Sequence, residues 1–224
     1  RAIYHSLHIV FNLDNFGILN IDTQGTDIDI TLDGSDPDFH TANLAGEADM
    51  VVAATANLTL DVVGDTTDND VDIATGGVLT GDINLGGGVD DITLAAGATL
   101  AGNVDQGAGD ESFTIGDLNT FTGTADGGAG TDSVVITDGL AGTDLDDIFT
   151  SYENVTIGGA GDVYSINNAG ASDIADIDMN DETTLVIDGG ANVTAPVDSD
   201  AADQTVSISN CLLYTSPSPR DFEA

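Results

Sequence analysis

Three consecutive blocks of equal length indicate how the chain folds: GGGVDDITLAAGATLAGNVDQ (86–106), GAGDESFTIGDLNTFTGTADG (107–127) and GAGTDSVVITDGLAGTDLDDI (128–148). Each block opens with glycines, continues with acidic residues and then has apolar residues at alternate positions. The same frame extends back to residue 44 and forward to residue 169. A fixed period of this length is typical of proteins built by stacking one structural unit.

Two positions of the repeat are apolar in every block, with one residue between them. The seventh position holds Met50, Val71, Ile92, Phe113, Val134 and Val155, and the ninth holds Val52, Ile73, Leu94, Ile115, Ile136 and Ile157. This alternation, with β-branched or polar residues between, predicts a short strand with one face inward. A second strand is predicted from Leu58, Leu79, Leu100 and Phe121, followed four residues later by Val62, Ile83, Val104 and Ala125. This second face weakens after residue 140, where we expect residues 144–149 to bulge outward.

A unit with two short strands cannot bury its apolar face alone, but stacked units bury it against one another. We therefore predict an all-β chain that forms a parallel β-solenoid, expected to be a right-handed β-helix, with about 21 residues per coil. The solenoid is predicted over residues 23–206, preceded by an N-terminal cap or irregular end over residues 1–22. Residues 211–224, CLLYTSPSPRDFEA, hold the only cysteine and resemble the translated sequencing-adapter tails of metagenomic gene fragments. We expect them to be a non-native tail.

The charge of the chain excludes several classes of partner. The formal net charge is −38, and the only basic side chains are Arg1 and Arg220. A field of this sign repels nucleic acids and anionic membrane surfaces and attracts divalent cations. No apolar segment is long enough for a membrane helix, so we predict no membrane insertion within this sequence. The acids are either a solvated outer face suited to a salty medium or, in part, metal ligands.

One corner of the repeat fits a calcium-binding pattern. The segment GGAGTDSVV (127–135) matches G-G-x-G-x-D-x-U-x, the nonapeptide of the calcium-binding β-rolls called RTX repeats. The candidate calcium ligands are the acids at this corner, Asp90, Asp91, Glu111, Asp132 and Glu153. The corner glycines are Gly86, Gly88, Gly107, Gly109, Gly128 and Gly130. The resemblance is partial, because RTX repeats place two facing half-sites on each turn and this chain has one. The alternative is that the glycines form tight corners and the acids are solvated turn residues.

Catalysis is not the favoured interpretation, and we assign no catalytic residues. Polysaccharide lyases of the β-helix type resemble one another in using Arg or Lys on acidic sugars, and residues 2–219 contain neither. A polysaccharide hydrolase needs only two carboxylates, so pairs such as Asp90 with Asp91 or Asp146 with Asp147 keep it as an alternative. The chain has no Trp to form a sugar platform, and its histidines, at positions 5, 8 and 40, adjoin no nucleophile pattern.

The segments LGGGVDDITLAAGATLAGNVDQGAGDESFTIGD and GGAGTDSVVITDGLAGTDLDD, followed by FTSYENVTIGG, resemble passenger regions of bacterial autotransporters and other large repetitive surface adhesins. The resemblance covers residues 44–160. It implies a structural or adhesive stalk, extracellular or on the bacterial outer surface, that presents regions binding a host-surface or matrix ligand. The alternative function is a calcium-dependent module that folds on secretion.

Overall fold

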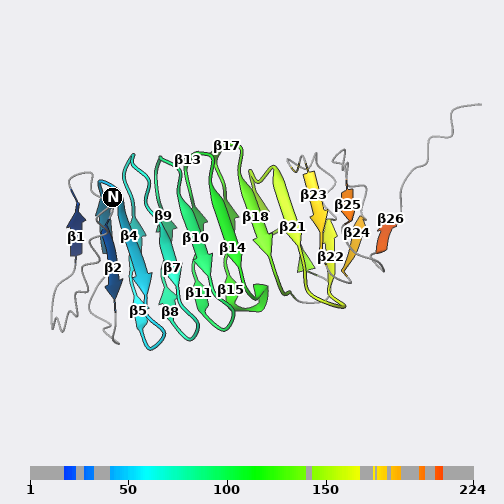
Figure 1. Ribbon diagram of the computed structural model, residues 1–224, viewed down its shortest axis with the longest axis horizontal. Helices are drawn as coiled ribbons and strands as arrows, with labels where there is room; N and C mark the ends of the chain where they lie inside the picture. The colour runs from blue at the N-terminus through cyan, green and yellow to red at the C-terminus, as the bar shows by residue number, and fades with distance from the viewer. Residues whose placement is uncertain are drawn as a thin grey trace, which may run out of the picture.

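The computed structural model describes residues 18–23, 28–32, 41–139, 143–166, 174, 176–180, 183–187, 197–199 and 205–208. Within these ranges the chain is all β apart from one short 3-10 turn, η1 (Leu118–Thr120). Successive coils lie side by side and form a rod, with β1 and β2 at one end and β26 at the other (Figure 1). The predicted parallel β-solenoid is confirmed. The predicted tail, the three histidines and residues 1–17 lie outside the described residues.

Each described strand pairs in parallel with strands of the neighbouring coils. The nine-stranded sheet comprises β2 (Ile28–Leu32), β4 (Ala48–Val52), β7 (Val71–Ile73), β10 (Asp91–Leu94), β14 (Ser112–Ile115), β18 (Ser133–Ile136), β21 (Asn154–Ile157), β23 (Asp176–Met179) and β25 (Val197–Ser199). The seven-stranded sheet comprises β1 (Ile18–Asp22), β3 (Thr41–Ala45), β6 (Asp61–Val63), β9 (Ile83–Asn84), β12 (Val104–Asp105), β16 (Ala125–Asp126) and β20 (Phe149–Thr150). Strand β1 belongs to a segment for which the sequence suggested a cap.

The smaller sheets complete the coils. One four-stranded sheet comprises β5 (Asn57–Thr59), β8 (Val78–Thr80), β11 (Thr99–Ala101) and β15 (Phe121–Thr122). The other comprises β19 (Thr143–Asp144), β22 (Val163–Ile166), β24 (Thr184–Ile187) and β26 (Thr205–Ile208). A two-stranded sheet joins β13 (Ala108–Gly109) to β17 (Ala129–Gly130) at one corner.

The register follows the sequence repeat through the centre of the rod. Ile92 pairs with Phe113, and Phe113 pairs with Val134, so these side chains stack directly on one another. Toward the ends of the nine-stranded sheet the spacing changes by one residue: Ile28 pairs with Ala48, and Val155 pairs with Ile177. The handedness of the coil stays a prediction.

A central coil has three strands where the sequence predicted two. The predicted second strand divides at a glycine, so that Leu79 lies in a four-stranded sheet and Ile83 lies in the seven-stranded sheet. Gly81 makes this bend with φ +144°, and a Cβ there would overlap the carbonyl oxygen of Leu60 in the preceding coil. Leu79 and Ile83 are both buried, so the two short strands close two different sides of one core.

The core consists of inward-facing columns of apolar side chains that run along the rod. Burying one such Val, Leu, Ile or Phe side chain stabilises the fold by about 1.5–3 kcal/mol. Aromatic rings fill the central coils, where Phe113 meets Phe121 edge-on with centroids 5.4 Å apart. Phe121 stacks on Phe149, and Phe149 meets Tyr152 edge-on. The rings therefore bridge sheets that face different sides of the solenoid.

The expectation that residues 144–149 bulge outward is wrong for the apolar residues of this segment, although Asp147 between them is exposed. Leu145 and Phe149 are only 1% and 7% exposed, and Phe149 pairs with Ala125 in the seven-stranded sheet. The coil between the paired residues Ala125 and Phe149 therefore contains more residues than the regular coil between Val104 and Ala125. The apolar residues of the longer segment turn into the core, and the corner that follows, residues 151–153, is correspondingly short.

Candidate functional site

The candidate site is the corner that connects the seven-stranded sheet to the nine-stranded sheet. One position of this corner lies one or two residues before a strand of the nine-stranded sheet, and it recurs once per coil because each coil makes the same turn. We call this set the corner column, and its members are Asn69, Asp90, Glu111, Asp132 and Glu153. The first four are buried, with exposures of 0%, 0%, 1% and 0%, and Glu153 is half-buried. Solvation of Asp90, Glu111 and Asp132 as turn residues, one of the two interpretations from sequence, is therefore wrong.

Side chains of the corner column accept hydrogen bonds from the preceding coil. The amide of Asn69 donates to Oδ1 of Asp90 at 2.6 Å, the amide of Glu111 to Oδ1 of Asp132 at 2.9 Å, and the amide of Asp132 to Oε2 of Glu153 at 2.8 Å. Glu111 does not continue this series, because neither of its carboxylate oxygens has a hydrogen-bond donor. Oδ2 of Asp90 and Oδ2 of Asp132 are likewise buried without a donor.

Burial without donors favours the protonated form of a carboxyl group. Burial raises the pKa of Asp90 to about 6. The pKa of Glu111 is raised to about 8, first by burial, then by contact with the carboxyl of Asp132 and by the negative charges of Asp132, Asp90 and Asp110. No Lys, Arg or His lies among the described residues to offset these charges.

The polar neighbours of the corner column are engaged elsewhere. Gln106 is buried, and its Nε2 donates to the carbonyl oxygens of Asp90 and Ser112, each at 3.0 Å. Its Oε1 accepts a 2.6 Å hydrogen bond from the hydroxyl of Tyr152. Asn69 Nδ2 donates to the carbonyl of Ala48 at 3.3 Å. These side-chain donors are therefore committed to carbonyl and amide oxygens and not to Glu111.

Glycines allow the coils to approach closely at this corner. Gly86, Gly107 and Gly128 stack with φ +92°, +100° and +99°. Gly88 and Gly130 have φ +134° and +157°. At Gly109, an added Cβ would overlap the carbonyl oxygen of Gly88 and press against Oε1 of Glu111. The missing side chain at Gly109 therefore makes the space that the longer Glu111 side chain occupies.

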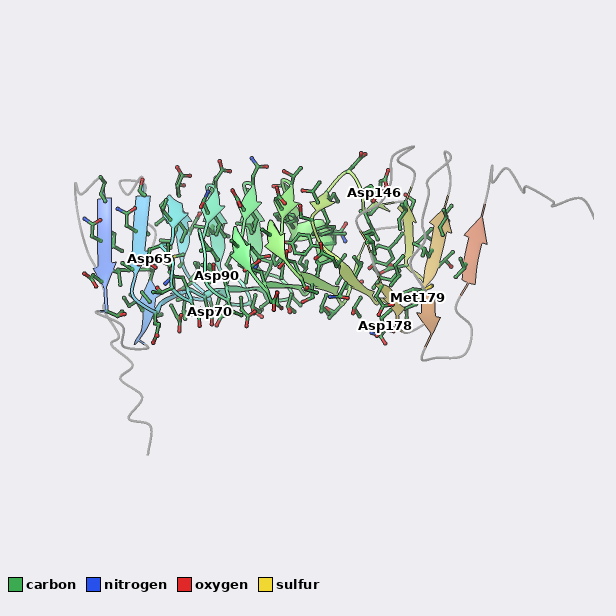
Figure 2. All side chains as sticks on the ribbon, turned by 90° about the horizontal axis from the view of Figure 1, so that it is seen from above. Asp65, Asp70, Asp90, Asp146, Asp178 and Met179 are labelled. Carbon is green, nitrogen blue, oxygen red and sulfur yellow. The ribbon has the colours of Figure 1, made fainter. Side chains whose placement is uncertain are left out.

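The predicted calcium ligands do not all come together. Asp91 begins β10 and is exposed, whereas Asp90 is buried, so the two neighbours face opposite sides and do not form a facing carboxylate pair. Figure 2 shows Asp90 nearer the middle of the rod than Asp70, which shares the outer column of Asp91. Among the described residues, no three His, Cys, Asp or Glu side chains form a group that could hold a metal ion. Calcium binding stays a prediction.

Asp residues outside the corner column also stack from coil to coil, and their side chains accept hydrogen bonds from backbone amides of the next coil. The sequence analysis did not predict this role. The amide of Asp70 donates to Oδ1 of Asp49 at 3.1 Å, and the amide of Asp91 to Oδ1 of Asp70 at 2.9 Å. In another column the amide of Asp82 donates to Oδ1 of Asp61, and the amide of Asn103 to Oδ1 of Asp82. In these columns the short Asp side chain reaches the backbone amide of the next coil. The sequence signal that could have predicted this capping role is the recurrence of acidic residues once per coil beside turn glycines.

Gln106 and Tyr152 were also missed, and the repeat contains no signal for them. They are 46 residues apart, which is not a multiple of the period, and they meet because the coil before Tyr152 is longer than the others.

No helix among the described residues has the length and apolar character needed to cross a membrane.

The fold defines the chain as an acidic β-solenoid repeat protein with carboxyl groups buried at one corner. No protein-family model, curated protein or solved structure matches it.

Proposed function

We propose that the chain is a non-enzymatic structural segment, a rigid acidic stalk of a secreted or cell-surface bacterial protein. The observation that carries the proposal is the parallel pairing of nine strands, β2 to β25, in a single sheet. In such a stack each coil contacts only its neighbours, so the length of the rod increases with the number of coils. At about 4.8 Å per strand, nine strands span roughly 40 Å.

The surface of the rod supports the same function. Asp61, Asp105 and Asp126 are exposed on the seven-stranded sheet, and Asp72 and Asp91 are exposed on the nine-stranded sheet. Because no basic side chain lies among the described residues, neighbouring copies repel one another. This repulsion would keep copies that stand close together on a surface from associating.

The stalk proposal is tested by displaying the chain on a bacterial surface between an outer-membrane anchor and a fluorescent tag. Energy transfer from a membrane dye to the tag should give one narrow distance distribution, unchanged by calcium or chelator. A Gly/Ser linker of the same number of residues is the control and should give a broad distribution, because it is a flexible coil. A distribution as broad as that of the linker would contradict the proposal.

A calcium-dependent module is a second candidate, favoured by the donor-free buried oxygens of Asp90, Glu111 and Asp132. Calcium prefers carboxylate and carbonyl oxygens, and a glycine-rich turn can supply the carbonyls. Circular dichroism with millimolar calcium and then excess chelator separates the candidates. A β-sheet spectrum under both conditions supports the stalk, whereas a coil that becomes β-sheet only with calcium supports the module.

A further inference from the structure

The segment Asn57-Leu58-Thr59 forms strand β5 and fits the N-x-S/T pattern of N-linked glycosylation. We propose that the folded chain presents Asn57 as the acceptor for an N-linked sugar, with Thr59 supplying the hydroxyl that a glycosyltransferase recognises. The modification adds to the proposed surface stalk, but the acceptor itself involves only β5 and its neighbours. Its test is therefore separate from the distance measurement that tests the stalk.

The first support is that the strand directs both recognised side chains to solvent. Alternate residues of a strand face opposite sides. Leu58 accordingly turns into the core with 5% exposure, whereas Asn57 and Thr59 are both exposed. Among the described strands, β5 is the last of its four-stranded sheet and pairs only with β8. The acceptor amide and the recognised hydroxyl therefore lie together on one accessible face of a terminal strand.

The second support is that the Asn57 side chain has no structural partner among the described residues. Other Asn side chains are used by the fold, as where Asn43 donates to Oδ1 of Asn20 at 2.7 Å. Asn is also depleted from strands, and the residues that stack on Asn57 in the next two coils are Val78 and Thr99. Asn57 therefore goes against the local strand preference and gains no contact in return, which is expected of a residue kept for another role.

The same pattern recurs in a different structural setting, which provides an internal control. The chain contains two further N-x-S/T segments, at residues 154–156 and 192–194, and the second of these lies outside the described residues. Asn154 and Thr156 are half-buried in β21, which pairs with β18 on one side and with β23 on the other. A strand held by two neighbours opens less readily than a terminal strand. Asn154 should therefore be the poorer acceptor in the folded chain.

The reaction is the transfer of a sugar from a glycosyl phosphate donor. Nδ2 of Asn57 forms a bond to the anomeric carbon of the sugar, and the bond between that carbon and the phosphate oxygen breaks. The phosphate group leaves with the bonding electrons, and Nδ2 gives one proton to a base of the transferase. A nucleotide sugar and a lipid-linked oligosaccharide both supply this chemistry, and the experiment distinguishes them.

The test incubates the folded full chain with two transferases that act on N-x-S/T segments. One is a soluble enzyme supplied with UDP-glucose, and the other is an oligosaccharyltransferase supplied with a lipid-linked oligosaccharide. Proteolysis on the N-terminal side of Asp then yields peptides 49–60 and 147–161, each with one candidate Asn. Mass spectrometry should find Asn57 modified by at least one enzyme, with an occupancy about tenfold or more above that of Asn154, which must first open locally.

The same two peptides, released before the reaction, are the unfolded controls, and both should accept the sugar. Thr59→Ser should retain transfer to Asn57, whereas Thr59→Val and Asn57→Gln should abolish it. The urea midpoints of these variants should match that of wild type, because both positions are exposed. The proposal would be overturned if Asn57 of the folded chain stayed unmodified by both enzymes, or if it were modified no more than Asn154.

Discussion

The hydroxyl of Tyr152 donates a 2.6 Å hydrogen bond to Oε1 of Gln106, and this bond joins two buried side chains that are 46 residues apart. Tyr152 also packs edge-on against Phe149, so the ring closes the aromatic cluster of the central coils. The contact connects the apolar core to the corner column, because Gln106 in turn donates to the carbonyl of Asp90.

Replacing Tyr152 with Phe should destabilise the fold by about 1–3 kcal/mol, because Oε1 of Gln106 would remain buried without a donor. The measurement is the urea midpoint at constant slope. Thr80→Val, a shape-conserving change at an exposed position of β8, serves as the control and should change stability by less than about 0.5 kcal/mol. Equal effects of the two variants would show that the hydroxyl bond contributes nothing.

Gly128→Ala should destabilise the rod far more than Gly97→Ala. Both glycines have positive φ, +99° and +78°, so each Ala meets a backbone strain of about 1–2 kcal/mol. At Gly128 the new Cβ would also overlap the carbonyl oxygen of Gly107, whereas at Gly97 its nearest neighbour is Thr75 Cγ2 at 3.7 Å. Overpacking adds about 1–3 kcal/mol. Thermal unfolding of the two variants measures the difference, and equal melting temperatures would contradict close stacking at this corner.

Asp82→Ala should lower the free energy of unfolding by about 0.5–1.5 kcal/mol, because the amide of Asn103 loses the acceptor to which it donates at 2.7 Å. Asp72→Ala is the matched control, since it removes the same charge from an exposed strand position. Loss of charge alone should leave this chain unchanged or slightly more stable, given its net charge of −38. The same urea midpoint distinguishes amide capping from general repulsion, and a stabilised Asp82→Ala would rule out the capping role.

Asp90→Asn should stabilise the fold more at pH 7 than at pH 4. Burial raises the pKa of Asp90 from 3.8 to about 6, so the folded state binds its proton more tightly than the unfolded chain does. Stability from this group is present below pH 3.8 and is lost as the pH rises through about 6. Asn keeps Oδ1 for the amide of Asn69 and carries no charge.

The prediction is checked by measuring the free energy of unfolding of wild type and Asp90→Asn at pH 4 and pH 7. Asp61→Asn serves as the control. Asp61 accepts the amide of Asp82 at 2.9 Å in an exposed column, so its replacement tests removal of a charge from a capping residue at the surface. If Asp90→Asn and Asp61→Asn gave the same change with pH, burial of Asp90 would have no energetic consequence.

Much of the fold could be predicted because a strand turns alternate residues to opposite faces. Apolar residues two apart, recurring at a constant period, place Ile92, Phe113 and Val134 in one column, as the pairing confirms. The division of the second strand at Gly81 could not be predicted in the same way. Leu79 and Ile83 lie four residues apart, a spacing that one continuous strand would also place on a single face.

The candidate site could be predicted only as a list of stacked positions. The period showed that Asp90, Glu111 and Asp132 follow one another, but it favoured neither metal ligation nor solvation and gave no indication of burial. Whether such a side chain points inward depends on the backbone angles of the glycine-rich corner, and glycine accepts many of these.

The repeat, the parallel stacking and the inward apolar columns can be derived from the amino-acid sequence, because they follow from local alternation at a constant period. Three further features depend on tertiary contacts: three corner acids lie inside, Leu145 and Phe149 turn inward, and Tyr152 meets Gln106. Each of these depends on how one coil rests on the next, and that contact is set by turn geometry and close packing, which no periodic pattern contains.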